Sequence, residues 1–115
     1  MSDPYRTSVE RLSRVSGVRG ALVVEVEAGV PVSAELAEDV SGPAVAALAA
    51  SLYRRTSAAA VGAGFGAART LQLETAEGHV IMVGAGDLMV VVVTEPAAQL
   101  GLVRLEAHRA AEALA

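Results

Sequence analysis

The clearest pattern in this chain is a pair of almost wholly apolar runs between positions 80 and 93. Residues 80–83 read Val-Ile-Met-Val, and residues 88–93 read Leu-Met followed by four valines. The Gly-Ala-Gly-Asp between them is typical of a tight turn that joins two strands. Because residues 88–93 show no polar alternation, we expect helices to cover both faces of that strand, in the middle of a sheet.

A helix is predicted to follow the second run. Thr94 is placed as its N-cap and Pro96 in its first turn. The helix then continues through residues 99–106, which read Gln-Leu-Gly-Leu-Val-Arg-Leu-Glu, toward the end of the chain.

The start of the chain carries the signals of another helix. The Asp-Pro pair at residues 3–4 is a typical helix start, with a capping side chain and a proline in the first turn. Apolar residues follow at helical spacing at Val9, Leu12 and Val15. Gly17 is placed to end this helix.

Two strands are predicted next. Residues 18–27 are apolar at first and alternate toward their end, and the Ala-Gly pair at 28–29 turns the chain into a short returning strand at 30–34. Pro31 cannot donate a ladder hydrogen bond, so this returning strand belongs at a sheet edge. Residues 35–40 then form an acidic connector.

A middle helix opens at residues 41–43, Ser-Gly-Pro, where a capping residue again precedes a proline. One of its faces is predicted to carry Val45, Leu48, Ala49, Leu52, Thr56 and Ala59. The opposite face is predicted to carry Ala44, Ala47, Ser51, Arg54, Arg55 and Ala58. This second face is flat because most of its side chains are small, and it has two guanidinium groups near its C-terminal end.

A further strand precedes the apolar pair. Residues 60–68 are rich in glycine and alanine and predict no regular element, whereas residues 69–75 alternate strictly, as a half-exposed strand does. Residues 76–78 then turn the chain into the first apolar run. The order helix, two strands, helix, three strands, helix predicts an α+β fold with a five-stranded antiparallel sheet packed between helices.

In this sheet the strands around Val32 and Leu73 belong at the edges. The edge at 69–75 has no proline, no lysine and regular alternation, so its backbone is open for pairing with a second copy of the chain. The predicted dimer interface consists of Arg69, Leu71, Gln72, Leu73, Glu74 and Thr75.

Length and composition predict one globular domain over residues 1–115. The chain is 53% hydrophobic and has no cysteine, which fits a reducing compartment. Its first residues are not those of a signal peptide, and its longest apolar run is far shorter than the roughly 20 residues of a membrane-spanning helix. We therefore expect a cytoplasmic protein with no membrane insertion.

The charge of the chain argues against nucleic acid as a partner. Its formal net charge is −4, which disfavours binding to a phosphate backbone. Aromatic residues make up only 3% of the chain, too few for base-stacking platforms. All nine basic residues are arginine, which we interpret as the codon bias of a GC-rich genome.

No cofactor or metal site is expected. Residues 62–67, Gly-Ala-Gly-Phe-Gly-Ala, resemble a dinucleotide fingerprint, but a helix precedes them and a strand follows, the reverse of the required context. His79 and His108 lie on different elements without metal-ligand spacing, so both are interpreted as surface residues. Glu25 and Glu27 share one face of their strand and are interpreted as a solvated strand end.

The sequence likewise contains no nucleophile next to a general base, so no catalytic residue is expected and the protein is predicted not to be an enzyme. Arg54 and Arg55 have two interpretations: they stabilise the C-terminal end of the helix dipole, or they belong to a contact surface. The second interpretation predicts a partner surface formed by Ala47, Ser51, Arg54, Arg55 and Ala58.

Three hydrophobic segments resemble the roadblock family, the dynein light-chain roadblock-type domains. They are residues 20–24 (Gly-Ala-Leu-Val-Val), residues 86–91 (Gly-Asp-Leu-Met-Val-Val) and residues 100–106 (Leu-Gly-Leu-Val-Arg-Leu-Glu). The resemblance covers the order and spacing of elements from about Val9 to Leu114. It implies a roadblock/profilin-like fold, with the middle helix on one face of the sheet and the two terminal helices on the other.

The resemblance also implies dimers in which the third strands pair into one continuous sheet and the middle helices lie side by side. Family members regulate or scaffold Ras-like small GTPases, and bacterial relatives of the MglB type accelerate GTP hydrolysis without an arginine finger of their own. The chain is thus expected to be a non-catalytic, homodimeric, bacterial regulator that binds a Ras-like small GTPase. The alternatives are a structural dimerisation scaffold for another signalling protein and, less favoured because the packing is dense, a small-ligand sensor.

Overall fold

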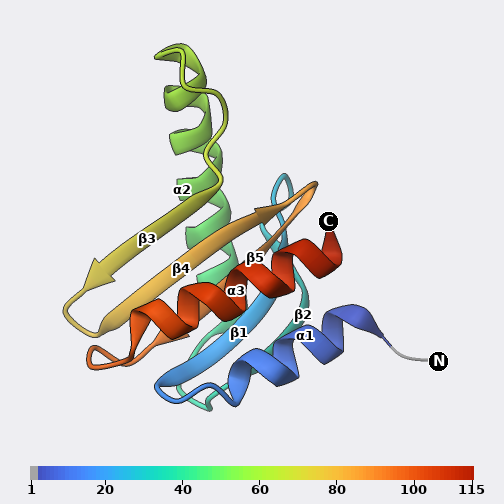
Figure 1. Cartoon of the computed structure of the whole chain (residues 1–115), viewed down its shortest axis with the longest axis vertical. Coiled ribbons are helices and arrows are strands. Elements are labelled where there is room, and N and C mark those ends of the chain that lie inside the picture. The colour runs from blue at the N-terminus through green and yellow to red at the C-terminus, as the bar shows by residue number, and fades with distance from the viewer. Residues whose placement is uncertain (1–2) are drawn as a thin grey trace.

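The computed structural model describes residues 3–115 and contains three helices and five strands in that range (Figure 1). In chain order these are α1 (Pro4–Ser13), β1 (Val18–Glu25), β2 (Val30–Leu36), α2 (Gly42–Gly62), β3 (Thr70–Thr75), β4 (Gly78–Ala85), β5 (Leu88–Thr94) and α3 (Leu100–Leu114). The predicted order of elements is confirmed.

The five strands form one antiparallel sheet in the order β2-β1-β5-β4-β3. The apolar strand β5 lies in the middle, as its lack of polar alternation predicts. The strands that contain Val32 and Leu73 lie at the two edges, and Pro31 is on the first of these, where its missing N–H disturbs no inner ladder.

Helices cover both faces of the sheet (Figure 1). On one face, α1 and α3 pack over a core that includes Val9, Ile81 and Val92. On the other face, α2 packs over a second core that includes Met82 and Val91. Successive residues of β5 therefore enter different cores, which explains why the strand is apolar throughout.

Both predicted N-caps at the first two helices are confirmed. The Asp3 carboxylate accepts hydrogen bonds from the backbone N–H of Tyr5 at 3.0 Å and of Arg6 at 3.3 Å. The Ser41 hydroxyl accepts a bond from the backbone N–H of Ala44 at 3.3 Å. The first helix ends at Ser13, so Val15 packs against the core from the turn that follows rather than from the helix.

The prediction that Thr94 caps the last helix is wrong. Thr94 is the buried final residue of β5, and its hydroxyl donates to the carbonyl of Glu95 at 2.9 Å. The helix begins at Leu100 after a short turn, and its N-cap Gln99 makes no side-chain capping bond. Thr94 is fully buried at the end of β5, six residues before the helix begins, so it cannot cap that helix.

Two predicted boundaries also shift. Glu35 and Leu36 belong to β2 rather than to the acidic connector, because Leu36 packs on the core beneath α2. The third strand begins at Thr70, one residue after Arg69.

The predicted faces of the middle helix are rotated relative to the structure. Ala46, Ala49 and Ala50 are the buried apolar residues of α2, whereas Leu48 is 44% exposed, and Thr56 and Ala59 are also exposed. Alanine occurs nearly all around this helix, so periodicity defines its faces poorly. The buried alanines are flanked by the half-buried Val45, Leu52 and Tyr53, and their small side chains let the helix backbone approach the sheet closely.

Candidate functional site

One backbone edge of β3 has no partner strand within residues 3–115. The N–H of Gly84 donates to the carbonyl of Arg69 at 2.9 Å, so these two residues form a hydrogen-bonded pair just before the strand. Such pairs alternate along an antiparallel ladder, and the odd-numbered residues of β3 therefore bond to β4. The backbone groups that face the open edge belong to Thr70, Gln72 and Glu74.

The two faces of β3 differ in polarity. Leu71 and Leu73 point to the α2 side of the sheet, where they are half-buried against the second core. On the opposite side, Arg104 donates to the Gln72 side-chain oxygen at 2.8 Å, and Thr70 lies 3.3 Å from the His108 ring nitrogen. The terminal helix α3 thus ties down the polar side of the edge strand and leaves its backbone free.

The structure brings the predicted partner surface together on the outer side of α2. Ala47, Arg54, Arg55 and Ala58 are exposed, and Ser51 is half-buried. Leu48, which sequence reasoning placed on the other face, is exposed beside them. The surface therefore combines small side chains, one leucine and two arginines.

The two arginines are not equivalent. The Arg54 guanidinium donates to the backbone carbonyls of Val26 at 2.6 Å and Glu27 at 3.3 Å, so it holds the β1–β2 hairpin against α2. Arg55 makes no side-chain hydrogen bond or ion pair within residues 3–115. Sequence reasoning missed this difference because the hairpin is distant in the chain. Arg55 is the arginine whose donors remain free for a partner.

The far end of α2 extends beyond the sheet, as Figure 1 shows in green. It carries Val61 at 58% exposure and is followed by Phe65 at 88% exposure. The Tyr53 hydroxyl donates to the carbonyl of Ala68 at 2.7 Å, and the N–H of Ala68 donates to the Ser57 hydroxyl at 3.2 Å. The only phenylalanine of the chain, set among glycines, is the sequence signal that could have identified this apolar tip.

The segment at residues 62–67 is a joint between a helix and a strand, as predicted. α2 ends at Gly62 and the next strand begins at Thr70. Gly64 and Gly66 have positive φ angles of 89° and 81°, which reverse the chain direction without strain.

The candidate metal-binding residues do not form a ligand set. No group of three or more His, Asp or Glu side chains with metal-binding geometry occurs within residues 3–115. His108 is exposed, but the prediction that His79 is a surface residue is wrong. His79 is 6% exposed at the start of β4, and its Nε2 lies 3.3 Å from the carbonyl of Pro96. Glu25 and Glu27 are exposed, as expected, but the prediction that both lie on one strand is wrong, because β1 ends at Glu25 and Glu27 lies in the turn that follows.

Two acidic residues of the 35–40 segment form ion pairs with arginines of α1 and β1. Arg6 lies 3.1 Å from Glu35, and Arg19 forms an ion pair with Asp39. The hydrogen bond from Arg19, together with its positive charge, lowers the pKa of the Asp39 carboxyl below its usual value. These contacts attach the connector to the body of the protein.

Over residues 3–115, no helix is long and apolar enough to span a membrane.

The sequence model of the Roadblock/LC7 domain matches residues 5–94, from the first helix to the end of the central strand. The chain belongs to the Roadblock/LC7 family. A Methanocaldococcus jannaschii protein, MJ1340, is 31% identical over 101 residues, which cover 88% of each chain. A second protein of that organism, MJ0310, is 30% identical over the same share.

Solved structures of this Roadblock/LC7 protein's relatives share its fold. Myxococcus xanthus MglB matches with a TM-score of 0.86 at 21% identity, over 96% of this chain and 90% of MglB. A structure described as MglB with tetrameric arrangement matches with a TM-score of 0.84 at 27% identity, over 99% and 89%. Acanthamoeba castellanii profilin IB matches with a TM-score of 0.67 at 20% identity, over 94% of both chains. These similarities indicate a small regulatory or scaffold domain and give no catalytic function.

Proposed function

We propose that this chain is a non-catalytic, homodimeric regulator that binds a Ras-like small GTPase. Two copies join through β3, and their α2 helices together form the docking surface. The observation that carries the proposal is an open, unprotected β3 edge next to an exposed α2 face, in a member of the Roadblock/LC7 family.

The geometry of β3 supports antiparallel pairing with itself. A two-fold axis perpendicular to the sheet keeps the α2 side of both copies on the same side, so directly opposed residues must point the same way. Pairing centred on Gln72 meets this condition. It sets Leu71 opposite Leu73 of the second copy on the α2 side, and it joins the outward backbone groups of both strands.

Exposed apolar surface near this edge also supports a dimer. Leu71 and Leu73 are only half-buried on the α2 side, and the α2 tip exposes Val61 and Phe65. A second copy related by this axis brings its own α2 to the same face of the extended sheet. The apolar area that it covers stabilises the dimer by about 25 cal/mol for each Å² removed from water.

The outer side of α2 supports protein binding. Its small side chains let another backbone approach closely, Leu48 supplies an exposed apolar group, and Arg55 supplies free donors. Arginine with an apolar neighbour is a common anchor of protein interfaces. The Ras-like identity of the partner rests on the family resemblance of the sequence.

The test is a calorimetric titration with a Ras-like GTPase from the same genome, loaded with GDP or with a GTP analogue. We expect Arg55→Glu to weaken binding by about 2 kcal/mol if Arg55 is an anchor, because the change reverses an exposed charge in the surface. Arg54 is left unchanged because its contacts to the β1–β2 hairpin would confound the result.

Arg14→Glu is the matched control. Arg14 is exposed next to the end of α1, on the opposite side of the sheet from α2, so this variant should bind as the wild type does. Equal binding by the wild type and Arg55→Glu would remove α2 from the proposal. No binding of the wild-type protein in either nucleotide state would favour the plain dimerisation scaffold.

A further inference from the structure

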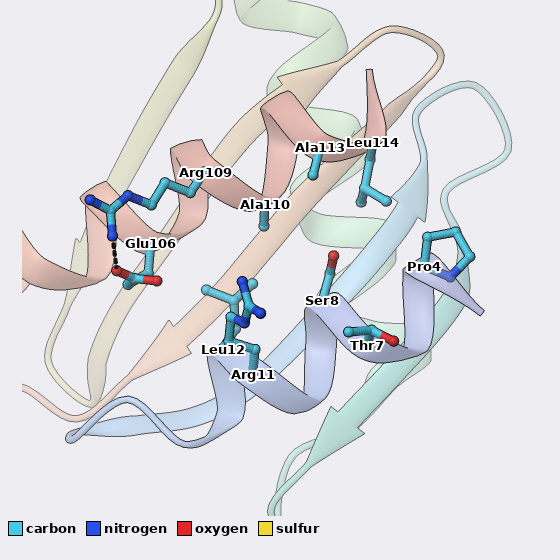
Figure 2. Close-up of a pocket in the computed structure, with 10 residues that line it drawn as sticks. All are labelled: Pro4, Thr7, Ser8, Arg11, Leu12, Glu106, Arg109, Ala110, Ala113 and Leu114. Carbon is cyan, nitrogen blue, oxygen red and sulfur yellow. Dashed lines mark hydrogen bonds and ion pairs between the residues drawn. The ribbon is translucent and has the colours of Figure 1, made fainter. Parts of the chain in front are cut away.

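A groove of about 270 Å³ lies between α1 and α3, on the other side of the sheet from α2 (Figures 1 and 2). Its α1 side is lined by Thr7, Ser8 and Arg11. Arg11 follows Ser8 by three residues and Thr7 by four, so the three lie along one side of the helix. Ala110 and Ala113 line it from α3. The lining thus follows the two helix axes, and the seven residue steps from Pro4 to Arg11 give it a length of about 10 Å at 1.5 Å per step.

The base of the groove is apolar and its walls are low. Leu12 is almost completely buried, and Leu114 and Ala110 are half-buried against the same core. Figure 2 shows Ala110, Ala113 and Leu114 pointing from α3 toward the α1 side. Small wall residues let the backbone of a third helix approach closely.

The charged group of the groove that has no partner within residues 3–115 is a hydrogen-bond donor. The Arg11 side chain makes no hydrogen bond or ion pair within residues 3–115. The carboxylate that lines the groove, Glu106, is already paired with Arg109 at 3.0 Å, as the dashed line in Figure 2 marks. Because Arg11 is exposed with its donors free, an occupant that supplies an acceptor gains a charge-assisted bond, and carboxylates are the acceptors that guanidinium groups bind best.

The charge of the whole helix pair favours the same kind of occupant. α1 and α3, with the α1 cap residues Asp3 and Arg14, hold five arginines against four acidic residues. The remainder of the chain holds four arginines against nine acidic residues. A protein with a net charge of −4 thus presents one basic side, and such asymmetry attracts and orients an acidic partner.

We propose that the groove between α1 and α3 binds an acidic amphipathic helix of a partner protein. Its apolar stripe packs over Leu12 and Leu114, and a carboxylate near one end pairs with Arg11. The site is separate from the proposed GTPase surface because α2 lies on the opposite face of the sheet. It does not depend on the dimer or on the GTPase.

The probe is a fluorescent helical peptide of about four turns, with leucines along one side and glutamates beside them, and a twin in which lysine replaces each glutamate. We expect the glutamate peptide to bind and the lysine twin not to bind. Arg11→Glu should weaken binding by roughly tenfold or more, the usual effect of losing a charge-assisted hydrogen bond. Arg14→Glu, the same charge change outside the groove lining, should alter it by less than about threefold.

A second pair of variants tests the groove without changing charge. Ala113→Trp places a large side chain on the exposed groove wall and should prevent binding, whereas Ala44→Trp, on exposed α2, should not. Amide shifts in a titration followed by NMR should map to α1 and α3. Equal binding of both peptides, no saturation at millimolar peptide, or shifts confined to α2 would overturn the proposal. A membrane result would also overturn it. If phosphatidylserine vesicles bind the protein more tightly than the peptide does, and Arg11→Glu and Arg14→Glu weaken that vesicle binding equally, the basic side is a lipid-binding surface.

Discussion

Gly78 is the residue whose conformation most constrains the sheet. Its φ angle is +149°, and a Cβ atom added there would lie 1.9 Å from the carbonyl oxygen of Thr94 in the central strand. Because that oxygen belongs to the backbone of a buried strand, it has little freedom to move. Glycine is therefore required where β4 begins.

We expect Gly78→Ala to destabilise the protein by about 2–3 kcal/mol, because it combines a backbone clash with an unfavourable φ angle. Gly86→Ala is the matched control, since Gly86 has a φ angle of +67° but open space around its Cβ position. This control should lose about 1 kcal/mol from its backbone conformation alone. Urea unfolding of both variants measures the difference, and equal losses would show that the contact with Thr94 does not matter.

Single residues could be predicted where their roles are local. Asp3 and Ser41 act as N-caps because each bonds to backbone groups two or three residues ahead. Thr94 and His79 were predicted wrongly because their surroundings come from distant segments. The chain after β5 folds back so that the Pro96 carbonyl reaches His79, a contact that no local pattern encodes.

At the scale of elements, Tyr53 links the long helix α2 to the segment that leads into β3. Its hydroxyl donates to the carbonyl of Ala68 at 2.7 Å. Gly84 on β4 makes room for it, since a Cβ atom there would lie 2.1 Å from the Tyr53 hydroxyl oxygen. Burial also raises the pKa of Tyr53 above its usual value of 10.0.

Tyr53→Phe should lower the free energy of unfolding by about 1 kcal/mol at neutral pH, because it removes this hydrogen bond. A raised pKa in the folded state means that the neutral phenol is favoured by folding. The associated stability is complete below the usual pKa and is lost as the pH rises through the folded-state pKa. Urea unfolding between neutral pH and pH values above 10.0 should therefore show a steeper loss for the wild type than for Tyr53→Phe. Parallel curves would contradict this role for Tyr53.

The type and order of the elements could be predicted, whereas the orientation of α2 could not. Uninterrupted apolar runs mark the central strands, and Pro31 marks an edge strand. In α2, alanines lie on both the buried and exposed sides, so spacing alone placed the exposed Leu48 on the same face as the buried Ala49 and assigned the buried Ala46 to no face. Packing decides the orientation there because small residues favour close approach to the sheet.

At the scale of the molecule, the two proposed binding surfaces lie on opposite sides of the sheet. The α2 side has exposed apolar groups and the free Arg55, and the other side has the basic groove between the terminal helices. The resemblance to the roadblock family predicts the layers, which the structure confirms. The groove could not be predicted, because Arg11 and Ala113 are brought near each other only by the packing of α1 against α3. The dimer stays a prediction.

The structure changes which residue tests that dimer. A proline at Leu73 would remove a bond to β4 and disturb the sheet itself, since odd-numbered residues of β3 bond to that neighbour. The only backbone donor that Gln72→Pro removes is an N–H that faces the open edge. Gln72→Ala keeps this N–H and, like the proline variant, loses the contact with Arg104, so it is the matched control.

Light scattering of these three proteins at micromolar concentration tests the central claim most directly. The wild type and Gln72→Ala should have twice the chain mass of 11.6 kDa, and Gln72→Pro should have the mass of one chain while keeping the wild-type circular dichroism spectrum. A wild type that remains a monomer at every concentration, or a folded Gln72→Pro that remains a dimer, would contradict pairing through β3.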